Sequence, residues 1–264
     1  MKTKPCFVIA HRYSENHICY LEHFINNIEK FYGDVLIIII DNNSPKKLEL
    51  LNNLENKKNI VVLENNTEHK FENGAYLVGV NYLINNGLID KYDYYVFTQD
   101  TYILKNKYDF DELINNNVYA CPISFGCGTQ DFNMNEIRPH VENLGLWDDN
   151  LTINYNTALY SVEPYSEKFQ KQILHCFCSV YIIHSSKIKE LFEYLKKIKI
   201  VTRRESELNE RYFAWVLYYL NNKQNYQIDI NPYSLYDMNR INLMEDFNHG
   251  YFAKHKQGKT EKTL

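Results

Sequence analysis

Glycine and proline are scarce in this chain, which has nine glycines and six prolines among 264 residues but 23 tyrosines and 14 phenylalanines. Neither the G-x-G-x-x-G pattern nor the G-x-x-x-x-G-K-[ST] pattern occurs. Such loops bring backbone N–H groups against the phosphates of a nucleotide. Without them, a phosphate ligand would have to be held by a metal ion or by basic side chains.

Other classes of protein are also excluded by what is missing. The six cysteines include no C-x-x-C pair, and their spacing matches neither a zinc site nor a disulfide framework. A formal net charge of −4 argues against a polycation that binds nucleic acid. The longest apolar run, residues 35–40, has the length of a strand and not of a membrane span. The apolar stretch after Pro5 is too short for a signal peptide. We therefore expect a soluble, cytoplasmic protein with no nucleic-acid partner and no membrane span.

The first hundred residues alternate between predicted strands and helices. Apolar runs predict strands at 4–10, 35–40, 60–63 and 94–97. Helical periodicity predicts helices at 15–31, 47–54 and 74–85. Strands that are apolar on both faces and joined by helices are typical of a parallel sheet covered on both sides. The expected fold class is therefore α/β and Rossmann-like, with a mostly parallel central sheet and helices on both faces.

The second half of the chain is less regular. Strands are expected at 118–124, 157–162 and 178–183, and helices at 187–198 and 206–220. The last segment, 247–264, is polar and basic. The acidic residues that follow Trp147 form either a turn or a rival metal site. In the second case, the indole of Trp147 could stack on a sugar.

Polar residues follow the predicted parallel strands, where ligands of open α/β sheets bind. The first strand delivers His11 and Arg12, the second Asp41, Asn42 and Asn43, and the fourth Gln99 and Asp100. Asp100 is a candidate ligand for Mn²⁺ or Mg²⁺, because these ions prefer oxygen ligands and bridge phosphates. Glu72 precedes a helix start, where an acid complements the helix dipole and where an anionic ligand is also favoured.

The basic tail is expected to close over a diphosphate. It contains Lys254, Lys256 and Lys259, and its histidines His249 and His255 are candidates to complete a metal shell with Asp100. The alternative is a solvated basic tail without a ligand.

The run from Cys6 to Asp100 resembles the nucleotide-binding half of a GT-A glycosyltransferase, most like the family 2 group. The matching pieces are CFVIAHRY, VLIIIIDNNS, FENGAYLVGVNYLI and YYVFTQDT, in the expected order and spacing. The resemblance implies a single GT-A domain over 1–264. Its parts would be a nucleotide-sugar-binding half at 1–102, an acceptor-binding half at 103–246 and a closing tail at 247–264.

The same resemblance implies roles for individual residues. Ala10, His11, Arg12 and Asp41 would hold the base of the nucleotide sugar, and Asn73 and Gly74 would lie beside the donor. The family's Asp-x-Asp motif, which binds metal and diphosphate, is represented by Thr98, Gln99 and Asp100, so only the last acid is kept. The tail piece NHGYFAKH resembles a closing segment in which His binds metal and Lys binds diphosphate.

The implied activity is transfer of a sugar from a nucleoside-diphosphate donor, with a UDP-sugar favoured, to a hydroxyl of a glycan or glycoprotein. An inverting enzyme needs a carboxylate base, for which Glu210 is the first candidate and Glu207 the second. A salt bridge with a nearby arginine such as Arg203 is the structural alternative for Glu210, and a retaining reaction needs no such base. A non-catalytic nucleotide-sugar or glycan-binding protein is the alternative function. A methyltransferase is a third, disfavoured by the missing Gly-rich turn.

Overall fold

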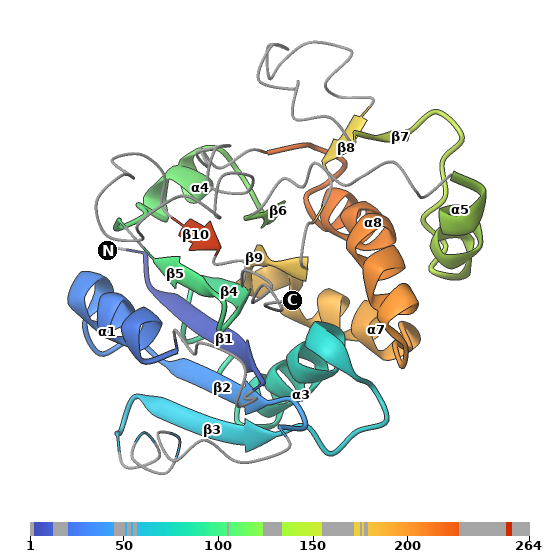
Figure 1. Cartoon of the computed structure of the whole chain (residues 1–264). Coiled ribbons are helices and arrows are strands. Elements are labelled where there is room, and N and C mark those ends of the chain that lie inside the picture. Colours follow the sequence, from blue (N-terminus) through green and yellow to red (C-terminus); the bar gives the residue numbers. More distant parts are fainter. Residues whose placement is uncertain are drawn as a thin grey trace, which may run out of the picture.

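The computed structural model describes residues 3–12, 21–44, 51, 54, 57–104, 106–123, 134–154, 172–174, 176, 179–226 and 252–254. A six-stranded sheet forms its centre, in the order β3-β2-β1-β4-β9-β6 (Figure 1). The strands are β1 (Pro5–His11), β2 (Ile37–Asp41), β3 (Ile60–Glu64), β4 (Tyr94–Gln99), β6 (Ala120–Pro122) and β9 (Tyr181–His184).

The sheet is mostly parallel, as the sequence predicts. β1 pairs in parallel with β2 and with β4, and β2 pairs in parallel with β3. β9 is antiparallel to both β4 and β6, which the sequence analysis did not predict. In the β1–β4 register Ala10 lies opposite Gln99, and in the β1–β2 register His11 lies opposite Asp41. The carboxyl ends of these three strands therefore meet at one edge of the sheet.

Both faces of the sheet are covered by helices, which confirms the predicted arrangement. Phe7 and Ile9 belong to a buried cluster with α1 (Leu21–Tyr32). The alternate residues Cys6 and Val8 belong to a second cluster on the other face (Figure 1). That cluster includes α3 (Phe71–Asn85), α7 (Ile188–Lys197) and α8 (Arg203–Leu220). Burial on both faces explains why the strands are continuous apolar runs.

The remaining elements are short. They are β5 (Tyr102–Leu104), α4 (Asp111–Asn115), α5 (Met134–Asn143), β7 (Thr152–Asn154), β8 (Gln172–Leu174), η3 (Ser185–Lys187) and β10 (Phe252–Lys254). β10 pairs with β5 in an antiparallel ladder, and β7 pairs with β8 in parallel. Within the described part of the chain, no helix combines the length and the apolar character that crossing a membrane requires.

Two helices begin three residues earlier than the periodicity predicts. α8 begins at Arg203 because Thr202 and Glu205 form a capping box, in which each side chain bonds the other's backbone N–H. α3 begins at Phe71, before the apolar pattern becomes regular. The predicted helix at 187–198 is confirmed by α7. The predicted strand at 157–162, most of the helix at 47–54 and the start of the helix at 15–31 lie outside the described residues.

Candidate functional site

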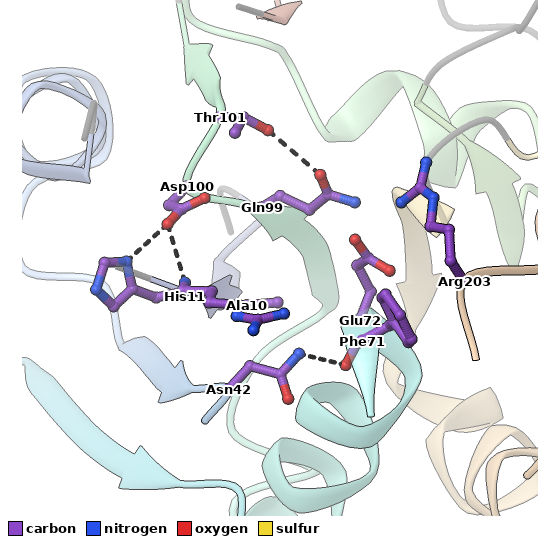
Figure 2. A pocket seen from close by; sticks show the side chains of 10 residues that line it. Ala10, His11, Asn42, Phe71, Glu72, Gln99, Asp100, Thr101 and Arg203 are labelled. Carbon is purple, nitrogen blue, oxygen red and sulfur yellow. Dashed lines mark hydrogen bonds and ion pairs between the residues drawn. The ribbon is translucent and has the colours of Figure 1, made fainter. Parts of the chain in front are cut away.

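A cavity of about 460 Å³ lies at the carboxyl ends of β1 and β4. Its lining comes from three strand ends and from the starts of α3 and α8 (Figure 2). The lining residues are Ala10, His11, Arg12, Asn42, Phe71, Glu72, Gln99, Asp100, Thr101 and Arg203. This is the edge at which open α/β sheets bind their ligands. Five of the residues predicted to bind the donor or metal, namely Ala10, His11, Arg12, Gln99 and Asp100, are therefore brought together here.

Asp100 is fixed in place by the end of β1. Its Oδ2 lies 2.7 Å from Nδ1 of His11 and accepts a second hydrogen bond from the backbone N–H of Arg12 at 3.1 Å. The backbone N–H of Asp100 donates to the carbonyl oxygen of Ala10 at 3.1 Å. The His11 side chain is fully buried, whereas that of Asp100 is 15% exposed. Among the described residues, the side-chain hydrogen bonds that Asp100 accepts all go to Oδ2, so Oδ1 is the oxygen that a ligand would contact.

Asn42 shapes the wall of the cavity next to Phe71. Its Nδ2 donates to the carbonyl oxygen of Phe71 at 2.6 Å, and its Oδ1 accepts from Nδ2 of Asn65 at 2.7 Å. Phe71 has a φ of 56°, in the left-handed region that a bulky residue rarely adopts. Strained backbone of this kind persists only where its surroundings hold it, and it is frequent at binding sites. Asn42 therefore acts as a brace that holds the strained residue at the start of α3.

Two guanidinium groups line the cavity, one from Arg12 after β1 and one from Arg203 at the start of α8. Nε of Arg203 donates to Oε1 of Glu207 at 3.1 Å. Burial opposes the charge of Arg203, but the hydrogen bond to Glu207 raises its pKa above the usual value. The carboxylates of Glu210 and Glu72 raise this pKa further. The cavity thus presents permanent positive charge, which suits a phosphate ligand.

Glu72 and Gln99 add polar groups between these cations. Glu72 lies in the first turn of α3, where its charge complements the helix dipole. Figure 2 shows its carboxylate pointing toward the part of the cavity that Gln99 and Arg203 line. Oε1 of Gln99 accepts a hydrogen bond from the hydroxyl of Thr101 at 3.2 Å. A carboxylate, an amide and a hydroxyl are groups that can bond the hydroxyls of a polar ligand.

The described residues do not assemble a metal shell. Among them, no three His, Cys, Asp or Glu side chains gather closely enough to hold a metal ion. His11 contacts Asp100, but its Nδ1 is already engaged with that carboxylate. The other predicted ligands, His249 and His255, lie outside the described residues. The donor set on the described part of the chain therefore does not by itself fit a resident divalent metal.

Three residues predicted to bind the donor lie outside the cavity lining. The Oδ1 atom of Asp41 accepts the backbone N–H of Ser44 at 3.1 Å, as in a turn. Nδ2 of Asn73 donates to the carbonyl oxygen of Ile198 at 3.0 Å. A Cβ atom at Gly74 would collide with the carbonyl oxygen of His69. Asp41 and Asn73 thus bond other parts of the protein, and Gly74 lies against the backbone of His69, while their contacts with the donor stay a prediction.

The two predicted base candidates also lie outside the lining and form ion pairs. Oε2 of Glu210 lies 3.2 Å from Nη1 of Arg211, and these side chains are 9% and 6% exposed. Glu207 pairs with Arg203. An ion pair, which is the structural alternative for Glu210, is thus present with Arg211.

The acidic loop that follows α5 forms a turn. The indole Nε1 of Trp147 donates to Asp149 at 2.8 Å, and the ring stacks on Trp215 with the centroids 5.7 Å apart. Oδ1 of Asp148 accepts the backbone N–H of Asn150 at 2.9 Å. Contacts within the protein thus engage the side chains of Trp147 and Asp148, and a structural turn is sufficient to explain this acidic loop.

The described part of the basic tail lies next to the chain that leaves the cavity. In the β10–β5 ladder Lys254 lies opposite Tyr102, which follows the cavity residue Thr101. The predicted diphosphate and metal ligands Lys256, Lys259, His249 and His255 lie outside the described residues. The closing role of the tail stays a prediction.

Sequence reasoning assigned no binding role to five of the lining residues, namely Asn42, Phe71, Glu72, Thr101 and Arg203. Asn42 and Thr101 directly follow predicted site residues, so the strand-end rule covers their positions. Arg203 joins the site from a helix much later in the chain. The only local signal for it is a pair of arginines at a helix start, where the dipole disfavours cations.

No family model matches this chain, and no curated protein matches its sequence. Solved structures that are similar to it include core-mannan synthase A from Aspergillus fumigatus in its Mn/GDP form, with 11% identity over 83% of this chain and 70% of that one and a TM-score of 0.41. S. aureus TarS 1-349 in complex with UDP has 10% identity over 97% of this chain and 61% of that one, with a TM-score of 0.46. The mannosyltransferase Ktr4p from S. cerevisiae has 12% identity over 80% of this chain and 62% of that one, with a TM-score of 0.38. This chain spans less than two thirds of the length of the TarS and Ktr4p chains.

Proposed function

We propose that this protein is a GT-A-type glycosyltransferase that moves a sugar from a nucleoside-diphosphate donor to a hydroxyl of a glycan or glycoprotein acceptor. A UDP-sugar is the favoured donor. The observation that carries the proposal is the strand-end cavity, which Arg12 lines together with the hydrogen-bonded pair His11 and Asp100. Support also comes from the sequence pieces that resemble the nucleotide-binding half of this enzyme class.

The transfer reaction depends above all on stabilising the negative charge of the leaving nucleoside diphosphate. A bond forms between the acceptor oxygen and the anomeric carbon of the sugar, while the bond from that carbon to the phosphate oxygen breaks. The electron pair of the broken bond stays on the nucleoside diphosphate. Cations such as Arg12 stabilise this developing negative charge. The buried His11 keeps Asp100 in position at the end of β4.

The acceptor proton has two possible fates, which correspond to the two stereochemical outcomes. In an inverting reaction a carboxylate of the enzyme accepts it. Glu210 and Glu207 are the acids that the sequence proposes for this step, and Glu210→Gln tests the first. In a retaining reaction the leaving phosphate can accept the proton. The anomeric configuration of the product, read by NMR, separates the two mechanisms.

Dependence on Mn²⁺ or Mg²⁺ remains a prediction from Asp100 and the tail histidines His249 and His255. When bound, such an ion would act as a Lewis acid on the diphosphate. The bond changes above are written without it, because the described donor set does not complete a shell. Measuring turnover with EDTA and with added Mn²⁺ tests the prediction.

The test of the proposed function is a thermal-shift screen of UDP, GDP and UDP-sugars, followed by a UDP-release assay. At a hundredfold excess over Kd, a true ligand should raise Tm by roughly 5 °C or more. Release of UDP from a UDP-sugar would then demonstrate donor turnover. If no nucleoside diphosphate shifts Tm, the proposal is wrong.

A non-catalytic nucleotide-sugar or glycan-binding protein is the second candidate. It is favoured by Gln99, which stands where an Asp-x-Asp motif has its first acid, and by the ion pairs that engage Glu207 and Glu210. Binding of UDP-sugar without any release of UDP, with or without Mn²⁺, would select this function.

A further inference from the structure

Arg203 reaches the cavity from the side opposite the strand ends that carry His11 and Asp100. Figure 2 shows it across the cavity from those two residues, on the first turn of α8. Its side chain is 67% exposed, so it is open to a ligand. Arg12 lines the same cavity from the end of β1. Two arginines, one from each half of the chain, therefore line the cavity.

The guanidinium of Arg203 is held by one nitrogen only. Its Nε donates to Oε1 of Glu207, one helical turn further along α8, at 3.1 Å. Within the described part of the chain, Nη1 and Nη2 make no hydrogen bond to protein. These two nitrogens lie on one edge of a planar group and match two oxygens of a phosphate. Glu207 thus fixes the orientation of the side chain and leaves its binding edge available.

The position of Arg203 also runs against local helix preferences. Cations are disfavoured in the first turn of a helix, yet Arg203 and Arg204 occupy the first two positions of α8. Arg204 has a structural partner, since its Nη2 lies 2.6 Å from Oε2 of Glu136. Arg203 has its partner within α8 itself and turns toward the cavity. A cation that is kept at a helix start and turned toward a cavity is the kind of local exception expected at functional sites.

We propose that Arg203 binds the phosphate oxygens of the nucleoside diphosphate opposite Arg12, and that Glu207 is the positioning residue that orients it. The inference rests on the proposed function and extends it. Glu207 thereby has a role other than that of a base. As the bond between the sugar and the phosphate breaks, the electron pair moves onto the phosphate oxygen, and Arg203 and Arg12 stabilise the charge that develops there. The charge of the leaving group is met by one arginine from each half of the chain.

The experiment measures the affinity of UDP by isothermal titration calorimetry for wild type, Arg203→Gln and Arg204→Gln. Arg204→Gln is a matched control, because it removes the same charge from the same helix turn but from outside the cavity lining. Loss of a charge-assisted pair of hydrogen bonds should weaken UDP binding by about 10- to 100-fold in Arg203→Gln. The control should stay within about twofold of wild type. Arg203→Lys keeps the charge but loses the planar edge, so its affinity for UDP should lie between those of wild type and Arg203→Gln.

The role of Glu207 is tested by a double-mutant cycle. Glu207→Gln should weaken UDP binding several-fold when Arg203 is present. It should have no further effect when Arg203 is already glutamine, because positioning acts only through that side chain. If Glu207 had a purely structural role, Glu207→Gln would lower the Tm equally in wild type and in Arg203→Gln. Its effect on UDP affinity would then not depend on whether Arg203 is present.

The outcomes separate this inference from the function on which it rests. If wild type binds UDP and Arg203→Gln binds it equally well, the inference is wrong and the proposed function stands. If Arg204→Gln loses as much affinity as Arg203→Gln, only general charge is involved and the inference is again wrong. If wild type binds neither UDP nor GDP, both proposals fail. Circular dichroism melts of each variant confirm that the exposed substitutions leave the fold intact.

Discussion

Nδ1 of His11 lies 2.7 Å from Oδ2 of Asp100, so the residues that end two neighbouring parallel strands are joined directly at the cavity. The bond connects the last residue of β1 to the first residue after β4. It holds the carboxylate against fully buried protein on one side and leaves it partly exposed on the other. The position of Asp100 is therefore set by the sheet and not by a flexible loop.

Asp100→Asn should reduce sugar transfer on the order of 100-fold, because losing the charged partner of His11 misplaces the groups around the diphosphate. The measurement is the initial rate of UDP release from the donor that the screen identifies. Glu64→Gln is the control, since Glu64 ends β3 at the same edge of the sheet but does not line the cavity. Full activity in Asp100→Asn would contradict the site as drawn.

Asn42→Ala should lower the free energy of unfolding by about 1–3 kcal/mol, because it removes the hydrogen bonds of Asn42 to the Phe71 carbonyl and to one N–H of the buried Asn65 amide. Urea denaturation measures this loss. Asn86→Ala removes an exposed amide that also bonds a backbone carbonyl, and it should cost no more than about 0.5 kcal/mol. Equal effects at the two positions would argue against a bracing role for Asn42.

Glu72→Gln should have opposite effects on stability and on nucleotide binding. Losing the first-turn acid of α3 should cost about 0.3–1 kcal/mol of stability. UDP should bind several-fold more tightly, because a negative charge that competes for Arg203 is gone. Isothermal titration calorimetry measures the affinity for UDP, and urea denaturation measures the free energy of unfolding. The control is Glu190→Gln in the first turn of α7, which should lose stability but leave UDP affinity unchanged.

The capping box of α8 should contribute a pH-dependent term to stability. Hydrogen bonds from the backbone N–H groups of Val201 and Thr202 lower the pKa of Glu205 from its usual 4.5. A lowered folded-state pKa stabilises the protein above the unfolded value, and the contribution is lost as pH falls through the folded value. Glu205→Gln should therefore cost less than about 1 kcal/mol at pH 7, since the group is largely exposed.

That cost should shrink as the pH is lowered below the unfolded pKa of Glu205, where wild type loses its charge as well. Urea denaturation at pH 7 and at acid pH measures the difference between the two proteins. Glu193→Gln on the exposed face of α7 should show no comparable trend, because its ion pair with Lys196 lies at the surface. A constant difference at all pH values would contradict the assignment.

The strand ends were predictable because buried parallel strands are long apolar runs whose polar ends are visible in the sequence. Ala10, His11, Gln99 and Asp100 follow directly from that pattern. The reversed direction of β9 was not predictable, since an apolar run such as YIIH reads the same in either direction. Only the packing of the whole sheet decides the direction of such a strand.

Roles are harder to predict from sequence than positions. Gly74 and Asn73 fit a glycine-containing helix start beside a ligand, but the close neighbours are the His69 carbonyl and Ile198. Sequence cannot distinguish a glycine that admits a ligand from one that admits another loop. Arg203 was visible only as an ion-pair candidate, because its place in the cavity depends on how α8 docks against the sheet.

The pairing of β10 with β5 has a consequence for how the molecule folds. Its partners, such as Phe252 and Leu104, are separated by most of the second half of the chain. Contacts of such long range form late, since the closure of a large loop must be compensated by structure that already exists. During synthesis, the β1–β4 sheet emerges well before residues 252–254. We therefore expect the strand ends that line the cavity to become ordered first, and the ladder beside Thr101 to form in a later and slower step.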